Sequence, residues 1–133
     1  MYLVDTNTVS DAHKGIPEPV SWLASVDPDL VYVSVITLGE IRRGIEMVRA
    51  TRPRKAFELE LWLASIRRDN ADRILPVTEE VATEWGRISA IRKRGDAYGL
   101  IAATALVYRM TVVTRNVADF AGAGVPVIDP WRL

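Results

Sequence analysis

The sequence predicts an α/β protein in which helices cover both faces of a parallel sheet. Short apolar runs rich in β-branched residues alternate along the chain with longer segments of helical periodicity. Such alternation is typical of parallel strands that are buried on both faces. The chain has 133 residues, which is enough for one domain with one core. We therefore expect a single domain over residues 1–133 with a three-layer α/β/α architecture.

Five apolar segments are the expected strands. The first is the run "YLV", which ends at Asp5, and the last follows "AGAGVP", which is typical of a turn. Ligands gather at the carboxyl ends of parallel strands, so polar residues just after a strand are candidates for a site. The strands are expected over residues 2–4, 30–34, 74–77, 111–114 and 127–128.

Five helices are expected between these strands. The one that contains "AFELELWLASI" is apolar on more than one stripe and must bury two sides, either in a core or against a protein partner. The one that contains "LIAATALVY" is apolar nearly all round, and we expect it to pack deeply against the sheet. The helices are expected over residues 7–14, 37–49, 53–69, 79–94 and 97–109.

Composition excludes several classes of site. The chain has no cysteine, which rules out disulfides and thiolate metal sites, and one histidine, His13, which rules out a histidine-rich zinc site. Lys and Arg total 17, as do Asp and Glu, so only local clusters can attract nucleic acid. No apolar run approaches the roughly 18 residues of a membrane span, and no signal sequence opens the chain. We expect a cytoplasmic protein without a membrane partner.

Four acidic residues are candidates for a shared site. Asp5 and Asp119 follow expected strands, Glu40 lies near the start of a helix that follows a strand, and Asp96 precedes the alanine-rich helix. Each also has a simpler interpretation. Asp5 and Asp96 fit helix caps, Thr37-x-x-Glu40 fits a capping box, and Asp119 fits a turn.

A metal site would explain why these acids converge. Carboxylates that meet without positive partners repel one another, and a divalent cation relieves that repulsion. Ligation by oxygen alone favours Mg²⁺ or Mn²⁺ over zinc, and such ions commonly act on phosphates. Neutral groups that could orient water or an acid lie at the strand ends, at Thr6, Asn7, Thr114 and Asn116.

A phosphate substrate would need basic contacts at the rim of such a site. The planar fork of arginine suits phosphate oxygens, although solvated surface charge is the simpler interpretation of any one basic residue. The basic residues closest in sequence to the acids are Arg42, Arg43, Arg92, Lys93, Arg94 and Arg115.

Several separated motifs resemble the PIN-domain ribonuclease toxins of bacterial VapBC and FitAB modules. They are "YLVDTNTVSD", "VSVITLGEIRRGIE", "GLIAATALVYRMTVVTRNVADF" and "VPVIDPW", in the family's order and through essentially the whole chain. The resemblance implies a single PIN domain whose acidic pocket binds Mg²⁺ or Mn²⁺ and cleaves RNA. It also implies a homodimer and a cognate VapB- or FitA-like antitoxin, through which the pair binds operator DNA.

The resemblance also assigns site residues. It implies that Asp5, Glu40 and Asp119 are catalytic acids, with Asp96 as the candidate for the remaining one, and that Asp5, Asp96 and Asp119 hold the metal. It matches Asn7, Thr114 and Asn116 to the family's supporting polar residues, and Thr6 is expected to support the site from its place after the first strand. The basic residues expected to face RNA or the antitoxin are Arg42, Arg43 and Arg115.

One position departs from the family pattern Asp-x-Leu-Ile-Ala-Ala. The acid should stand two residues before Leu100, where this chain has Tyr98, and Asp96 lies two residues earlier. Two residues on a helix are about 200° apart, so Asp96 can replace the missing acid only in non-helical backbone. Otherwise Tyr98 places a phenol where a carboxylate is expected, and metal affinity should fall.

Of three other functions, one remains open and two are disfavoured. A displaced third acid would favour a PIN fold that binds antitoxin or RNA but cleaves weakly or not at all. A phosphatase with Asp5 as nucleophile, of the haloacid-dehalogenase type, is disfavoured because Asn7 stands where those proteins place a second aspartate. Nucleotide hydrolysis is disfavoured because no Gly-x-x-x-x-Gly-Lys-Ser/Thr loop is present.

Overall fold

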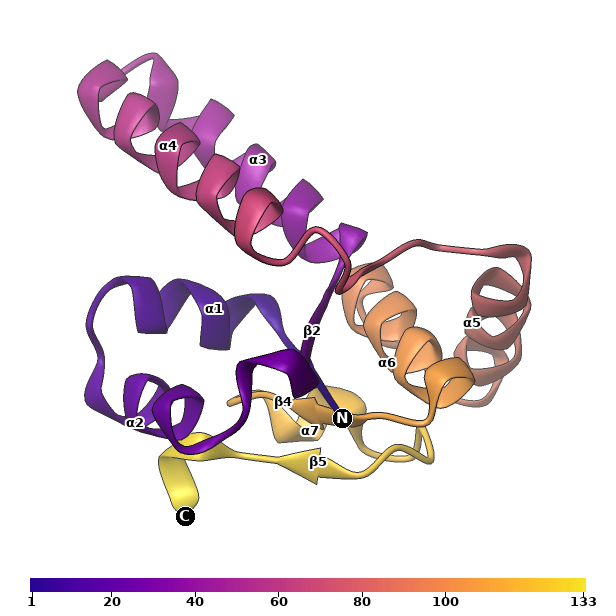
Figure 1. Ribbon diagram of the computed structural model, residues 1–133. Coiled ribbons are helices and arrows are strands. Elements are labelled where there is room, and N and C mark those ends of the chain that lie inside the picture. The colour runs from indigo at the N-terminus through magenta and orange to yellow at the C-terminus, as the bar shows by residue number, and fades with distance from the viewer.

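A five-stranded parallel sheet lies at the centre of the computed structural model, which describes residues 1–133 (Figure 1). The strand order is β3-β2-β1-β4-β5, and every neighbouring pair is parallel. The α/β class and the parallel sheet are therefore confirmed. The strands are β1 (Tyr2–Val4), β2 (Val31–Ser34), β3 (Ile74–Leu75), β4 (Thr111–Val113) and β5 (Val127–Ile128).

Seven α-helices surround the sheet. They are α1 (Thr6–His13), α2 (Pro17–Ser25), α3 (Val35–Arg49), α4 (Pro53–Asp69), α5 (Glu79–Ile91), α6 (Asp96–Tyr108) and α7 (Val117–Phe120). Short 3₁₀ helices, at Pro28–Leu30 and Pro130–Arg132, precede β2 and end the chain. None of the helices combines the length and apolar character needed to cross a lipid bilayer.

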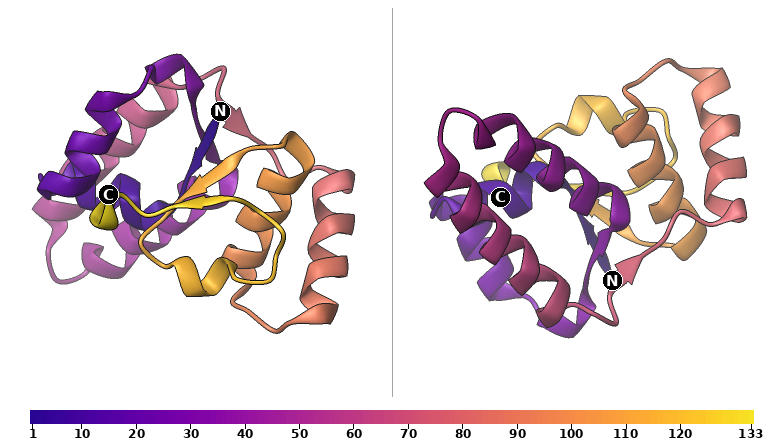
Figure 2. Two further views of the ribbon diagram at one scale, coloured as in Figure 1. Left: turned by 90° about the horizontal axis from the view of Figure 1, so that it is seen from below. Right: turned by 90° about the horizontal axis from the view of Figure 1, so that it is seen from above.

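The two faces of the sheet bury separate cores. Leu3 packs in the larger core with residues of α5, α6 and α7, whereas Val4 packs with Trp22 of α2 and Val113 of β4. Successive side chains of a strand point to opposite faces, which is why adjacent residues of β1 serve different cores. Figure 2 shows α5 and α6 on one side of the strands and α1 and α2 on the other. This is the expected three-layer architecture.

Helices α3 and α4 form a hairpin that projects from the sheet (Figure 1). It has its own small core, which includes Ile45, Ala56 and Leu63. The opposite side of α4 leaves Phe57 and Leu61 about 60% exposed. Helix α4 therefore has two apolar faces. One packs against α3, and the other is exposed to solvent in the single chain.

Two helices were not expected from the sequence. Helix α2 begins with Pro17, a residue suited to the first helical position, and buries Trp22. Helix α7 is four residues long, too short to show periodicity. The deep packing expected of α6 is confirmed, because Ile101, Ala102 and their neighbours as far as Ala105 are buried.

Candidate acidic site

Asp5 is the centre of the site. It follows β1 directly, its side chain is buried, and its backbone N–H donates to the carbonyl of Val113 at 2.9 Å. Its Oδ1 accepts from the N–H of Thr6 at 2.7 Å, and its Oδ2 accepts from the hydroxyl of Thr114 at 2.7 Å. The amide of Asn7 donates to the same Oδ2 at 3.3 Å. Asp5 therefore caps α1, as its simpler interpretation required, and is also held in a fixed orientation by neutral donors.

Two further acids act on Asp5. Burial raises the pKa of Asp5, the hydrogen bonds from Thr114 and Thr6 lower it, and the charges of Glu40 and Asp119 raise it again. Glu40 and Asp119 come from α3 and α7, so three separate parts of the chain bring their carboxyl groups together. No ion pair in the structure includes any of the three. Repulsion among these acids is therefore not relieved by a basic side chain.

Glu40 reaches this site through Thr6. The hydroxyl of Thr6 donates to Oε1 of Glu40 at 2.6 Å and lies 3.0 Å from the hydroxyl of Thr37. The capping-box interpretation of Glu40 is wrong, because α3 begins at Val35 and its cap is Ser34. Glu40 lies in the second turn, beyond reach of the first free N–H groups. Thr37 was read from the sequence only as part of that box, and no sequence signal placed its hydroxyl beside Thr6.

The expected supporting residues surround Asp5 and connect it to Asp119. The hydroxyl of Thr114 accepts from the N–H of Asn116 at 3.0 Å and from the amide of Asn7 at 3.3 Å. The N–H of Asp119 donates to the carbonyl of Asn116 at 3.1 Å. The polar residues named from the sequence therefore form one network at the carboxyl ends of β1 and β4.

Tyr98, rather than Asp96, faces the acids. Helix α6 begins at Asp96 itself, with Gly95 as its cap, so Asp96 is helical and exposed and caps nothing. The hydroxyl of Tyr98 accepts from the amide of Asn116 at 2.8 Å. Burial raises the pKa of Tyr98, and the charges of Asp119, Asp5 and Glu40 raise it further, against the bond from Asn116.

The structure therefore does not meet the condition under which Asp96 could replace the missing acid. The non-helical backbone that would turn its side chain toward the other acids is absent, since the helix already includes residue 96. Its charge is also not among those that shift the pKa of Asp5 or of Tyr98. The set Asp5, Asp96 and Asp119, expected to hold a metal, is not assembled.

The side chains of the site have the chemistry that a hard cation prefers, but too few of them lie close together to hold one. All the side chains around Asp5 offer oxygen or amide groups, which is the chemistry that Mg²⁺ or Mn²⁺ prefers. No group of three or more acidic or histidine side chains lies close enough to hold one metal ion. Tyr98, whose position holds a carboxylate in the family pattern given above, adds a phenol rather than a further acid to this set.

The expected basic residues differ in their surroundings. Arg115 is exposed, its guanidinium lies 5.5 Å from the ring centre of Trp131, and its N–H donates weakly to Asn7 at 3.4 Å. Arg43 is exposed and makes no hydrogen bond or ion pair. Arg92 and Arg94 donate to backbone carbonyls at residues 118 and 121 and so fasten α7. Arg115 is thus the basic residue most directly joined to the acidic site.

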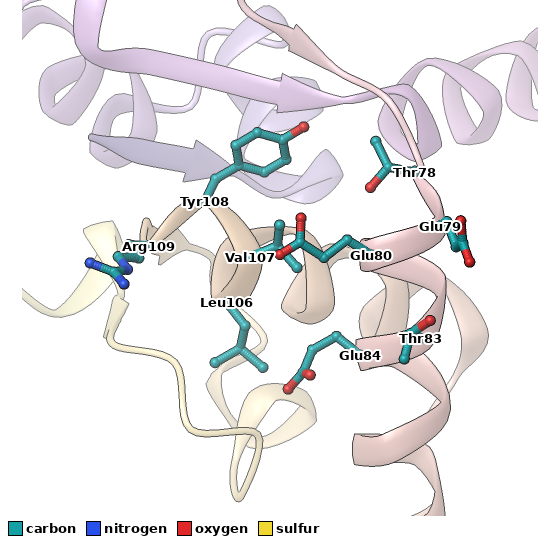
Figure 3. A pocket seen from close by; sticks show the side chains of 9 residues that line it. All are labelled: Thr78, Glu79, Glu80, Thr83, Glu84, Leu106, Val107, Tyr108 and Arg109. Carbon is teal, nitrogen blue, oxygen red and sulfur yellow. The ribbon is translucent and has the colours of Figure 1, made fainter.

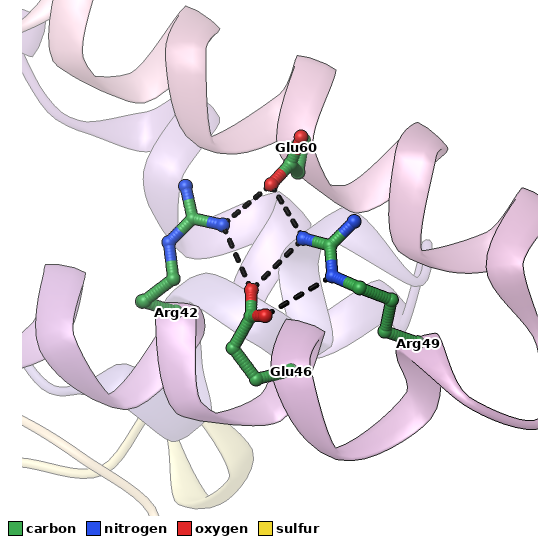
Figure 4. A network of polar contacts seen from close by, with 4 residues as sticks. All are labelled: Arg42, Glu46, Arg49 and Glu60. Carbon is green, nitrogen blue, oxygen red and sulfur yellow. Dashed lines mark hydrogen bonds and ion pairs between the residues drawn. The ribbon is translucent and has the colours of Figure 1, made fainter.

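Arg42 is engaged elsewhere. It donates to Glu60 at 2.6 Å and to Glu46 at 3.2 Å, and Arg49 contacts the same two glutamates (Figure 4). This network joins α3 to α4 on an exposed surface, where such pairs are screened by solvent and salt. The expectation that Arg42 faces RNA or antitoxin is therefore not supported by its contacts.

The contacts of Arg42 and Arg49 predict how the Glu46 carboxyl titrates. Hydrogen bonds from Arg49 and Arg42 lower the pKa of Glu46 from 4.5 to about 2. A depressed carboxyl pKa stabilises the fold above pH 4.5, and this contribution is lost as pH falls toward about 2. We expect carbon NMR to show the Glu46 carboxyl titrating below pH 4.5, and to show a higher pKa in Arg49→Gln. An unchanged pKa in that variant would contradict the network.

A large cleft lies away from the acids. It measures about 920 Å³ between the start of α5 and the end of α6, and Figure 3 shows Glu79, Glu80 and Glu84 around it with Arg109. The end of α6 leads into the start of β4, whereas the acids lie at the other end of that strand. A cleft rich in glutamate repels a polyanion, so we do not assign RNA to it.

Comparison with known proteins gives consistent matches. The family model described as "PIN domain" matches residues 2–123. The chain is 36% identical to Toxin FitB of Neisseria gonorrhoeae and 30% identical to VapC ribonuclease Y4jK of Sinorhizobium fredii, in each case over 99% of both chains. The crystal structure of FitAcB from Neisseria gonorrhoeae aligns with a TM-score of 0.90 at 36% identity over 100% of both chains. The structure of FitAB bound to the IR36 DNA fragment aligns with a TM-score of 0.78 at 34% identity, over 100% of this chain and 97% of that one.

Proposed function

The chain belongs to the PIN-domain family, and on that basis we propose that it is the RNA-cleaving toxin of a type II toxin–antitoxin module. The observation that carries the proposal is the buried carboxylate of Asp5, fixed by neutral donors and opposed by the charges of Glu40 and Asp119. The names of two relatives, a toxin and a VapC ribonuclease, support RNA hydrolysis as the reaction.

Partners follow from the same relatives. Structures similar to this chain are complexes of FitA with FitB, one of them bound to DNA. We propose a FitA- or VapB-like antitoxin as the partner of this chain, with operator DNA contacted through that antitoxin. A homodimer and a cytoplasmic location belong to the same proposal.

We propose that catalysis depends on Mg²⁺ or Mn²⁺ held by Asp5 and Asp119, with Glu40 beside them. When bound, such an ion activates water for attack on a phosphodiester and neutralises charge on the leaving oxygen. Thr114, Asn7 and the N–H of Thr6 keep the Asp5 carboxylate oriented, and the Thr6 hydroxyl orients Glu40. These bonds orient Asp5 and Glu40 before any ligand arrives, and such positioning is what efficient catalysis requires.

Arg115 supplies the positive charge at the mouth of the site. Its guanidinium makes no ion pair and rests over Trp131, so it is free to bind an RNA phosphate. Cation–π contact restrains the side chain without consuming its hydrogen-bond donors. Arg43 is exposed on α3 and is a secondary candidate for the same task.

Removal of divalent metal tests the proposal. We expect the purified chain to cleave single-stranded RNA in Mg²⁺ or Mn²⁺ and to stop in excess EDTA, with recovery when metal is restored. Cleavage is measured on gels with end-labelled RNA. Cleavage that continues at full rate in chelator would overturn the metal-dependent mechanism.

A second candidate function is a PIN fold that binds RNA or antitoxin but cleaves weakly. The observation that favours it is Tyr98, whose phenol faces the acids where the family pattern has a carboxylate. Under this alternative the wild-type chain binds RNA, but its cleavage rate in saturating Mn²⁺ stays close to that of Asp5→Asn.

A further inference from the structure

A cleft of about 260 Å³ opens between α1, α3 and α4, next to the acids. Thr6 and Glu40, which belong to the acidic site, also line this cleft. Its floor is apolar and includes Ile41 and Leu59. A ligand that reaches the acids can therefore extend into the cleft.

Two stacked rings line the cleft. The imidazole of His13 and the indole of Trp62 lie 4.1 Å apart between centroids, with ring planes 12° from parallel. Burial lowers the pKa of His13, and the charge of Lys55 lowers it further, so the imidazole is neutral at physiological pH. One face of the imidazole is covered by the indole, and His13 is exposed, so its other face offers a surface of the kind on which nucleic-acid bases stack.

Two lysines also line the cleft. Lys55, on α4, is half-buried and pairs with no carboxylate. Lys14, at the end of α1, is 69% exposed in its side chain, and its contact with Asp11 is long, at 3.9 Å. Both ammonium groups are thus available to an incoming anion. Besides these lysines and His13, the one ionisable group that lines the cleft is Glu40, at the end that joins the acidic site.

We propose that this cleft is a nucleotide subsite, which takes the base of the single-stranded RNA residue next to the scissile phosphate. The base stacks on the open face of His13, which Trp62 supports from behind, and Lys14 and Lys55 contact the neighbouring backbone phosphates. The subsite rests on the proposed ribonuclease function. Single-stranded RNA fits because its unstacked bases bind aromatic platforms while cations follow the backbone.

A peptide segment fits the cleft less well. An aromatic platform beside unpaired lysines matches a base linked to phosphates, and both features adjoin the acids that would cut the backbone. A peptide would need an acidic side chain at the lysines and, at the other end of the cleft, a basic side chain at Glu40. The antitoxin is therefore treated as the competing outcome of the test.

The test uses His13→Ala, His13→Phe and Lys55→Ala, with Arg54→Ala as the matched control. Arg54 is an exposed basic residue beside Lys55 that does not line the cleft. We expect His13→Ala to raise KM for a short single-stranded RNA about tenfold, as loss of one stacked base does, with kcat changed less than about twofold. His13→Phe should restore KM, because it keeps the stacking ring.

Lys55→Ala should raise KM and reduce the salt dependence of RNA binding by about one phosphate contact, whereas Arg54→Ala changes neither. Truncating the RNA by the nucleotide on one side of the cut should raise KM for the wild type and not for His13→Ala. Unchanged KM in both His13→Ala and Lys55→Ala overturns the subsite while the ribonuclease function stands.

Measuring RNA affinity at equilibrium tests the subsite independently of the ribonuclease function on which it rests. If the wild-type chain fails to cleave RNA, quenching of tryptophan fluorescence by the same oligonucleotide still measures the cleft. Weaker binding in His13→Ala and Lys55→Ala, with recovery in His13→Phe, supports the subsite. Unchanged RNA affinity combined with weaker binding of a cognate antitoxin assigns the cleft to a protein contact and overturns it.

Discussion

Asp5→Asn is expected to abolish RNA cleavage and to make the metal-free protein more stable. Loss of a group in the outer shell of a metal already costs about 10–100-fold in affinity or activity, so loss of the central carboxylate should cost more than about 100-fold. The gain in stability follows from burial: Asp5 is 2% exposed and is opposed by Glu40 and Asp119. The amide of Asn removes that charge and keeps an acceptor for the N–H of Thr6.

The pH dependence of this stability effect has a definite sign. The pKa of Asp5 is raised above its ordinary 3.8, so the folded chain holds this proton at pH values where the unfolded chain has released it. The stability of the wild type therefore falls as pH rises from 3.8 through the raised folded value. In Asp5→Asn this decline is absent, and the difference between the two melting temperatures is largest above the folded pKa.

Thermal melting in EDTA across this pH range, together with cleavage assays in Mn²⁺, measures both effects. Glu58→Gln is the matched control, because Glu58 is exposed and its side chain makes no hydrogen bond or ion pair. It should leave cleavage and melting unchanged. An Asp5→Asn chain that still cleaves RNA, or that melts earlier than the wild type in EDTA, would show that Asp5 is a structural cap rather than the central acid.

Local sequence was sufficient to locate the acids that follow strands. Asp5 and Asp119 were named because parallel strands bring their carboxyl ends to one edge, and the structure brings both there with Glu40. The same rule located Thr114 and Asn116 at the end of β4. These positions depend on sheet direction, which the alternation of strands and helices already indicates.

Local sequence could not show the contacts that tertiary structure decides. Arg42 pairs with Glu60 across the α3–α4 hairpin, a contact between residues 18 positions apart. The stacking of His13 on Trp62 joins α1 to α4 and has no local signal either. The other differences come from where two helices begin. Helix α3 begins at Val35, so Thr37 and Glu40 lie too far into the helix to form a capping box. Helix α6 begins at Asp96, so the backbone there is helical and does not turn the Asp96 side chain toward the other acids.

Tyr98→Asp is expected to increase metal affinity and RNA cleavage about tenfold or more, because it adds a carboxylate at the position that now faces three acids. The direction of the Tyr98 side chain supports this expectation: the charges of Asp119, Asp5 and Glu40 all act on its hydroxyl. The change also removes an edge-on ring contact with Phe120, so stability in EDTA should fall. Added Mn²⁺ should recover most of that loss, because it binds only the folded site.

Two further variants serve as controls for Tyr98→Asp, one for its charge and one for the role of Asp96. Tyr98→Asn has nearly the size of the aspartate variant and no charge, so it should lose the same packing without gaining metal affinity. Asp96→Asn should leave wild-type cleavage unchanged, since Asp96 is exposed at the first turn of α6. Mn²⁺ titration and kcat/KM on one RNA measure all three. If Asp96→Asn abolishes cleavage and Tyr98→Asp adds nothing, then Asp96 already completes the site when RNA or metal is bound. If Tyr98→Asp alone gains activity, the wild-type chain is a PIN nuclease limited by a single phenol.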